Sequence, residues 1–280
     1  MKVYGYQDAS QFYDRVKDYL LFQEARHCLL LGICNSLIKN PKRYDSEPYL
    51  AAVEKDGNII AVAIRTPPRK LLLSKMTDLV AVELIAEDLY KQKQKLPGVS
   101  SLPKEAEAFA QAWQNITGQS YKPDMQLRLH QLDTVEDVQQ ANGNLRLASI
   151  SDRELLIDWI EAFYTEALGS NEENASRAVD AFLSQNSFYI WESEIPVSIA
   201  GGRLLASNSG WIGPVYTPPQ YRKKGYASSC VAAVSQALLD KGCKSCYLFT
   251  DQANLTSNHI YQTIGYQAVD DWYDYSFSEK

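Results

Sequence analysis

The chain has 280 residues, of which 45% are hydrophobic and 22% are charged, and its formal net charge is -6 at pH 7. This length and composition are typical of a globular protein with two domains, and they exclude a disordered or fibrous chain. The acidic net charge argues against binding to nucleic acid or to an anionic membrane surface.

In the first half, apolar spacing and turn residues predict helices and strands in alternation. Phe12, Val16 and Leu20 recur at helical spacing, and the stretch Asp56-Gly57-Asn58 is typical of a hairpin turn. In chain order, the expected elements are a helix around 12–20, a helix over 22–38, a hairpin over 49–68, a short strand over 71–73, a helix over 79–90, a helix that begins at 103, and a strand over 125–132.

The polar stretch DTVEDVQQANGN, residues 133–144, is the predicted linker. After it, a similar order of elements begins again, with Ser151 and Glu154 as a capping box for the first helix. The expected elements are a strand over 145–149, this capped helix, a helix over 175–183, a hairpin over 188–205, a strand over 211–216, a helix over 227–241, a strand over 247–250, a helix over 256–263, and a final strand rich in Tyr and Trp.

The two halves therefore share one order of elements, which indicates a tandem repeat of one fold. We predict an α/β (α+β) protein with two domains, over residues 1–140 and 145–280. Each domain is expected to contain a mixed, mostly antiparallel sheet flanked by helices.

The N-terminal sequence and the cysteine count indicate a soluble, cytoplasmic protein. MKVYGYQDAS contains no apolar signal region, and the apolar runs are shorter than the roughly 20 residues that span a bilayer. Five cysteines fit reduced thiols better than a disulfide framework. The lone pair Cys243 and Cys246 lacks the further ligands of a zinc site, and the histidines are scattered, so we expect no metal.

Residues 215–242, VYTPPQYRKKGYASSCVAAVSQALLDKG, combine a strand, a basic loop and an amphipathic helix. Pro218 and Pro219 donate no N–H, so strand pairing must end there. The edge of the strand at 215–217 can then splay and pair with an extended ligand.

The loop that follows has the features of an anion site. Gly225 has no side chain to keep a phosphate away from the N–H groups at the helix start. Arg222, Lys223 and Lys224 add cations that can neutralise further charge on the same ligand. A solvated cationic turn before a helix is the alternative interpretation of the same residues.

In these motifs, the second half resembles the Gcn-five-related N-acetyltransferase (GNAT) superfamily. The loop [RQ]-x-x-G-x-[GA] of that family is matched by Arg222-x-x-Gly225-x-Ala227. Its Asn, followed seven residues later by Tyr in Y-x-x-[LIV]-G-[FY], is matched by Asn254 and by Tyr261 in YQTIGY. The stretches YTPPxYRxxGYAS and FTDxANxxSNxIYxxIGY further resemble the branch related to glycine N-acyltransferases. The resemblance covers about 145–277.

The resemblance implies that an acetyl group moves from acetyl-CoA to a small-molecule or peptide amine by direct attack, without a metal. Residues 215–217 would pair with the pantetheine arm and stabilise the oxyanion, and residues 223–228 would hold the pyrophosphate. Tyr261 would protonate the departing thiolate, and Asn254 would contact the pantetheine or assist the site. The implied catalytic residues are Tyr261 and Asn254, and the implied cofactor-binding residues are Val215, Tyr216, Thr217, Arg222, Lys223, Lys224, Gly225, Tyr226, Ala227, Ser228, Asn254 and Tyr261.

Several points stay open from the sequence. The base that takes the proton of the amine could be Asp251, Glu192 or Glu166. The first half has no glycine loop after Arg69-Lys70, so we expect a degenerate GNAT-like domain without a cofactor site. A non-catalytic acyl-CoA-binding or sensing module is the alternative function, and the chain is expected to be a monomer or a homodimer.

Overall fold

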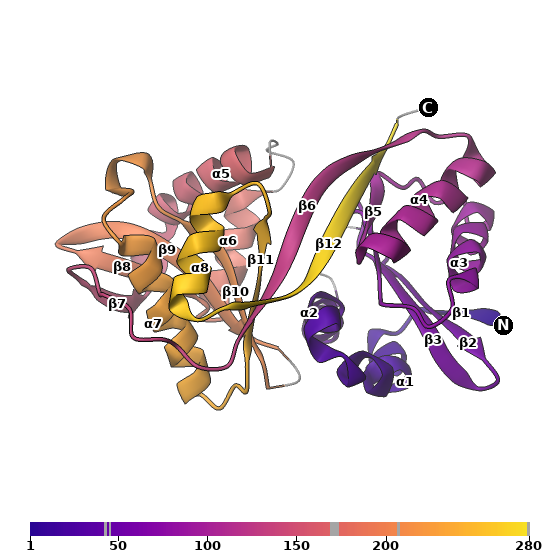
Figure 1. Ribbon diagram of the computed structural model, residues 1–280, viewed down its shortest axis with the longest axis horizontal. Helices are drawn as coiled ribbons and strands as arrows, with labels where there is room; N and C mark the ends of the chain where they lie inside the picture. The colour runs from indigo at the N-terminus through magenta and orange to yellow at the C-terminus, as the bar shows by residue number, and fades with distance from the viewer. Residues whose placement is uncertain (42–43, 45, 169–173, 206–207, 279–280) are drawn as a thin grey trace. The chain divides into compact units, whose positions relative to one another are not determined.

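The computed structural model describes residues 1–41, 44, 46–168, 174–205 and 208–278, which form two compact units (Figure 1). Unit 1 contains residues 1–129, 249–254 and the segment that begins at Ala268, and unit 2 contains residues 130–248 and 255–267. This division differs from the predicted domains 1–140 and 145–280, because the last strand of the chain lies in unit 1.

Unit 1 contains a mixed sheet in the strand order β1-β2-β3-β4-β5-β12-β6. Strands β4 and β5 pair in parallel, whereas β1 with β2, β2 with β3, β3 with β4 and β5 with β12 are antiparallel pairs. Its elements are β1 (Lys2–Tyr6), α1 (Ala9–Phe22), α2 (Glu24–Lys39), β2 (Tyr49–Lys55), β3 (Asn58–Arg65), β4 (Leu71–Leu73), α3 (Val80–Lys91), β5 (Gly98–Ser101), α4 (Pro103–Thr117), most of β6 (Tyr121–Leu132), and most of β12 (Gln267–Phe277).

Unit 2 contains the strand order β7-β8-β9-β10-β11, in which β10 and β11 pair in parallel, whereas β7 with β8, β8 with β9 and β9 with β10 are antiparallel pairs. Its elements are β7 (Asn144–Leu147), the 3-10 turn η1 (Ile150–Asp152), α5 (Arg153–Leu168), α6 (Ala175–Ser184), β8 (Phe188–Ser193), β9 (Ile195–Leu204), β10 (Gly210–Tyr216), the 3-10 turn η2 (Pro219–Tyr221), α7 (Tyr226–Asp240), the first half of β11 (Cys246–Asp251), and α8 (Leu255–Ile264). Helices and strands therefore follow the same order from β1 to α4 and from β7 to α8, and the predicted fold class is confirmed.

Helices cover both faces of each sheet, because alternate strand residues point to opposite faces. In β2, Ala51 and Val53 pack with α3 and α4, whereas Leu50 and Ala52 pack with α1 and α2. In unit 2, β8 divides in the same way between a cluster with α7 and α8 and a cluster with α5 and α6. Each unit therefore has two buried clusters, one on each side of its sheet.

The stretch predicted as a linker, residues 133–144, packs on unit 2. Val135 and Val138 lie against the unit 2 core. The Glu136 N–H donates to the Ile264 carbonyl at 2.9 Å. Two valines in an otherwise polar stretch are too few to reveal this packing as a periodic pattern.

The predicted capping box was wrong by two residues. The structure places it at Ser149 and Asp152, because a 3-10 turn precedes α5 and moves the start of the helix toward the N-terminus. The Ser149 N–H donates to Asp152 at 2.8 Å, and two nitrogens of Arg146 donate to the same carboxylate at 2.8 Å each. The hydrogen bonds from Arg146 lower the pKa of Asp152 to about 2.

Candidate functional site

The turn between β10 and α7 presents a row of backbone donors. Lys223 and Gly225 both have positive φ angles, +61° and +79°. The repeating backbone hydrogen bonds of α7 begin with the one from the Ser229 N–H to the Gly225 carbonyl, at 3.0 Å. Within the described part of the chain, the N–H groups from Lys223 to Ser228 donate to no protein acceptor. Together with the helix dipole, these donors can hold an anion.

Strand β10 separates from β11 just before this turn. The two strands pair only at Gly210 with Cys246 and at Trp211 with Tyr247. On its other side, β10 pairs with β9 through a register shift between Ile212 and Val215. The predicted opening at residues 215–217 is therefore present, but it begins earlier than Pro218. Pro214 lies within the register shift and also lacks an N–H, a signal that the sequence interpretation missed.

Arg222 turns its side chain back onto the protein. Its Nε donates to the Thr217 carbonyl at 2.8 Å, and its Nη2 donates to Glu166 at 2.6 Å. The Tyr216 hydroxyl donates to the other Glu166 oxygen at 3.0 Å. Burial is the largest cause that raises the pKa of Tyr216, and Glu166 is the next. The hydroxyl of Tyr216 therefore stays protonated and remains a donor. No periodicity links Glu166 to a loop far along the chain, so the sequence did not reveal this contact.

The two lysines of the loop differ from Arg222. Lys223 and Lys224 are exposed. In the part of the chain that the structure describes, neither makes an ion pair. They are therefore the loop cations with freedom to reach an anionic ligand.

Tyr261 lies on α8 with 8% of its surface exposed, within the unit 2 core. Its ring meets Tyr266 edge-on at a centroid distance of 5.8 Å. Burial, with Cys230 as the smaller cause, raises the pKa of Tyr261 well above its usual value. Among the described residues, its hydroxyl makes no hydrogen bond. Its phenol therefore stays protonated and has a proton to donate.

Asn254 is exposed and directly precedes α8. Its N–H donates to the Asp251 carbonyl at 3.0 Å. It belongs to segment 249–254 of unit 1, whereas the basic loop and Tyr261 belong to unit 2. Residues 215–217 and 222–228 both lie in unit 2.

The three candidate bases are all engaged by the protein. Glu166 holds Arg222, as described above. Glu192 accepts a hydrogen bond from Arg146 Nε at 2.6 Å. Asp251 accepts from the Ala253 N–H at 2.9 Å. The structure therefore singles out none of the three as a base.

The corresponding turn of unit 1, between β4 and α3, is filled by protein groups. The Lys75 N–H donates to His27 Nε2 at 3.2 Å, and the Met76 N–H donates to the buried Glu105 at 3.0 Å. At the start of α3, the Val80 N–H donates to Asp78 at 3.1 Å. Side chains of unit 1 therefore accept from three N–H groups around this turn, whereas the N–H groups from Lys223 to Ser228 in unit 2 have no protein acceptor among the described residues.

His27 should make the stability of the protein depend on pH. Both ring nitrogens are bonded to the backbone, to Leu20 and Lys75, and burial lowers the pKa of His27 from 6.5 to about 4. The unfolded chain therefore binds more protons than the folded one between these pH values. Stability should fall as pH drops through this window, by up to about 1.4 kcal/mol per pH unit.

Urea unfolding of the wild type, His27→Gln and His259→Gln between pH 7.5 and 4.5 measures this effect. The slope should be smaller in His27→Gln. His259 is exposed, so its variant should keep the wild-type slope. Equal slopes in all three proteins would contradict the assignment.

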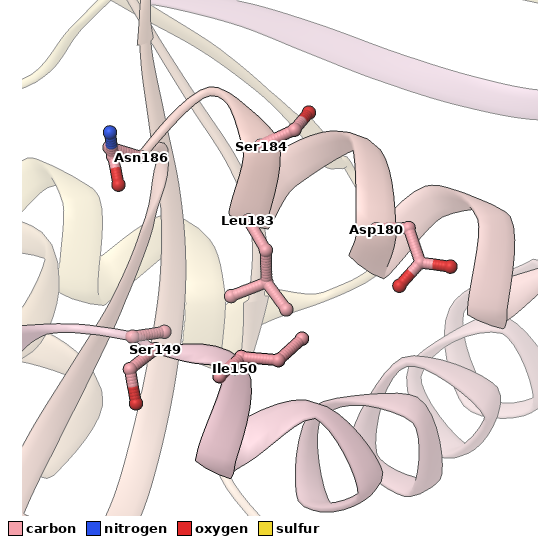
Figure 2. A pocket seen from close by; sticks show the side chains of 7 residues that line it. Ser149, Ile150, Asp180, Leu183, Ser184 and Asn186 are labelled. Atoms are coloured by element: carbon pink, nitrogen blue, oxygen red, sulfur yellow. The ribbon is translucent and has the colours of Figure 1, made fainter.

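A surface depression in unit 2 is lined by residues around η1 and along α6 (Figure 2). It contains none of the predicted site residues, and its carboxylate, Asp180, already pairs with Arg153 at 2.7 Å. Its lining residues are Ala148, Ser149, Ile150, Asp180, Leu183, Ser184 and Asn186.

The five cysteines are all buried, and none forms a disulfide. Burial raises the pKa of Cys34, Cys230 and Cys246 to about 12, which leaves these thiols unreactive. Among the described residues, no group of three or more His, Cys, Asp or Glu could hold a metal ion. In the same part of the chain, no helix has both the length and the apolar character to cross a membrane.

Comparison with known proteins points to one family. Residues 153–266 match the acetyltransferase (GNAT) family model. A sequence search of curated proteins finds no match. Solved structures with a similar fold include a GNAT-family acetyltransferase from Colwellia psychrerythraea, which is 11% identical with a TM-score of 0.60 over 100% of both chains.

Two further structures share the fold. A GCN5-related N-acetyltransferase from Sphaerobacter thermophilus is 14% identical, with a TM-score of 0.63 over 87% of this chain and 85% of its own. A tandem GNAT protein from the clavulanic acid biosynthesis pathway is 10% identical, with a TM-score of 0.61 over 100% of this chain and 99% of its own. Residues 153–266 thus carry the sequence pattern of the GNAT acetyltransferase family, within a fold that solved GNAT proteins share.

Proposed function

We propose that unit 2 transfers an acetyl group from acetyl-CoA to an amine. The observation that carries this proposal is the row of N–H donors from Lys223 to Ser228, directly after a strand that has opened from its neighbour. A pyrophosphate fits the donors, and an extended amide chain fits an open strand edge. In coenzyme A, a pyrophosphate is joined to the pantetheine arm, which is an extended amide chain. One ligand therefore supplies the group for the loop and the group for the strand edge. The family match over 153–266 supports the same reaction class.

The reaction needs no covalent intermediate on the protein. The amine nitrogen attacks the thioester carbon, the C–S bond breaks, and Tyr261 gives its proton to the departing thiolate. A backbone N–H from residues 215–217 stabilises the oxyanion. The surplus proton of the amine leaves to a base or to water. The similarity to the glycine N-acyltransferase branch makes glycine the first acceptor to try.

A second candidate function is binding or sensing of an acyl-CoA without turnover. It is favoured by the ion pairs of Glu166 with Arg222 and of Glu192 with Arg146, which occupy two of the three candidate bases. Release of free CoA from acetyl-CoA separates the two functions. A panel of amines that begins with glycine should give release above the rate without an amine if the protein is an acetyltransferase.

Acetyl-CoA should bind with a stoichiometry of one per chain. In the part of the chain that the structure describes, this row of N–H donors without a protein acceptor lies in unit 2, whereas His27, Glu105 and Asp78 accept hydrogen bonds at the turn of unit 1. At a ligand concentration one hundred times the Kd, binding should stabilise the fold by about 2.7 kcal/mol. Isothermal titration calorimetry measures the stoichiometry. Two equivalent sites, or no binding, would contradict the proposal.

A further inference from the structure

The contacts of Arg222 join three separate parts of unit 2. Its Nε reaches the Thr217 carbonyl at the end of β10, and its Nη2 reaches Glu166 in the last turn of α5. Its guanidinium also lies over the Tyr216 ring, with 5.7 Å to the centroid. Glu166 in turn receives the Tyr216 hydroxyl. One arginine and one glutamate thus connect a helix, the end of a strand and the basic loop.

This arrangement leaves Arg222 unsuited to neutralise a phosphate. Its charge is already paired with the Glu166 carboxylate, and two sides of its planar fork are occupied. The same contacts hold the start of the loop against the end of β10, immediately before the first unsatisfied N–H group at Lys223. A single lysine ammonium cannot reproduce a planar fork that reaches two acceptors in fixed directions.

We infer that Arg222 and Glu166 are positioning residues, which hold the N–H groups of the loop and the end of β10 in place for the ligand. This inference rests on the proposed function. The charge on the phosphates is then met by Lys223, Lys224 and the helix dipole. Ligand binding therefore requires the planar shape of a guanidinium at position 222, whereas at position 223 it requires only a positively charged side chain.

Substitution of Arg222 or Glu166 should change the free energy of unfolding very little. The side chains of Arg222 and Glu166 are 43% and 44% exposed, and ion pairs at such exposure add little to folding. Ligand affinity should report the positioning role instead, because misplaced N–H groups lose their hydrogen bonds to the pyrophosphate.

Calorimetry with CoA and with acetyl-CoA tests the inference on the full chain. Arg222→Lys should weaken binding of both ligands by about tenfold, because charge is kept and the fork is lost. Lys223→Arg keeps the positive charge at 223, and it should weaken binding less than Arg222→Lys does. Glu166→Ala should weaken binding, and the double variant with Arg222→Lys should be little worse than either single variant.

Asp180→Asn provides the matched control. Asp180 pairs with Arg153 at the opposite end of α5, at 2.7 Å. Its loss should leave CoA affinity and the urea midpoint near the wild type, and the urea midpoint should also hold in Arg222→Lys and Glu166→Ala.

Three other outcomes of these binding measurements would contradict the inference or the proposed function. Wild-type affinity in Arg222→Lys would overturn the inference, because charge alone would then suffice at 222. An equal loss in Asp180→Asn would also overturn it, because any disturbance of α5 would then have the same effect. If the wild type binds neither ligand, the proposed function itself fails.

Discussion

Gly225→Glu is expected to lower the affinity for acetyl-CoA by at least about 100-fold, which is about 2.7 kcal/mol of binding free energy. The new side chain would place a carboxylate beside the N–H groups that are proposed to receive the pyrophosphate. It would then act as an internal anion at the helix N-terminus and compete with the ligand. Calorimetry or displacement of a fluorescent CoA analogue measures the loss.

The fold should tolerate this change. A Cβ at 225 would meet only the Ala141 Cβ, at an ordinary contact distance of 3.6 Å. The positive φ of +79° makes any side chain there cost about 1–2 kcal/mol of stability. A carboxylate near the positive end of a helix returns about 0.3–1 kcal/mol of this. Circular dichroism of the variant should therefore match the wild type.

Gly118→Glu is the control for backbone strain. Gly118 has a φ of +75° and no atom within 4 Å of its added Cβ, but it ends α4 in unit 1. It should lose comparable stability and keep the wild-type affinity. Affinity that survives in Gly225→Glu would mean that the basic loop is a solvated turn.

Local pattern was enough to predict most of the fold. Helix α7 was expected over 227–241 and spans Tyr226–Asp240, and the hairpins of both halves lie where their turn residues placed them. Two short strands were missed, although the three-residue β4 was expected at its observed position, 71–73. Strand β1 has five residues and an irregular burial pattern, and strand β5 has only four residues, all buried. Neither strand is long enough to show a period.

The position of β12 could not be predicted from local pattern either. Its sequence was correctly interpreted as a strand, but it pairs with β5, from Tyr273 with Ser101 to Ser276 with Gly98. Gly98 permits this pairing, because a Cβ there would lie 2.0 Å from the Tyr275 carbonyl oxygen. Contacts between segments far apart in the chain depend on tertiary packing, which local pattern does not show.

In the candidate site too, the features set by adjacent residues could be predicted, and the features set by distant partners could not. The glycine, the flanking cations and the start of the helix follow from adjacent residues, so the loop could be predicted. The direction of the Arg222 side chain depends on Glu166, and the filled turn of unit 1 depends on His27 and Glu105. These partners come from other helices, and only the folded chain brings them to the turns.

Tyr261→Phe is expected to lower turnover by about 100-fold, at the low end of general acid catalysis, because a thiolate is a tolerable leaving group. The ring should keep its place against Tyr266, and only the hydroxyl is lost. The Kd for acetyl-CoA should stay within about threefold, or roughly 0.6 kcal/mol. Steady-state kinetics with an established acceptor, together with calorimetry, separates the two quantities.

The pH profile gives a second measurement on the same variant. Burial raises the pKa of Tyr261 far enough that the phenol stays protonated throughout the range in which the enzyme is assayed. The alkaline limb of the rate should therefore have the same midpoint in the wild type and in Tyr261→Phe, with only the height changed. A shifted midpoint would mean that the ionisation of Tyr261 itself limits the rate.

Tyr266→Phe is the matched control for Tyr261→Phe. Its hydroxyl bonds Ser235 Oγ at 2.8 Å in the buried core, so its loss should cost about 1 kcal/mol of stability and leave turnover unchanged. If affinity falls as far as turnover in Tyr261→Phe, the hydroxyl binds the ligand and another group is the acid. If neither falls, Tyr261 only packs the core, and the thiolate leaves without help from this phenol.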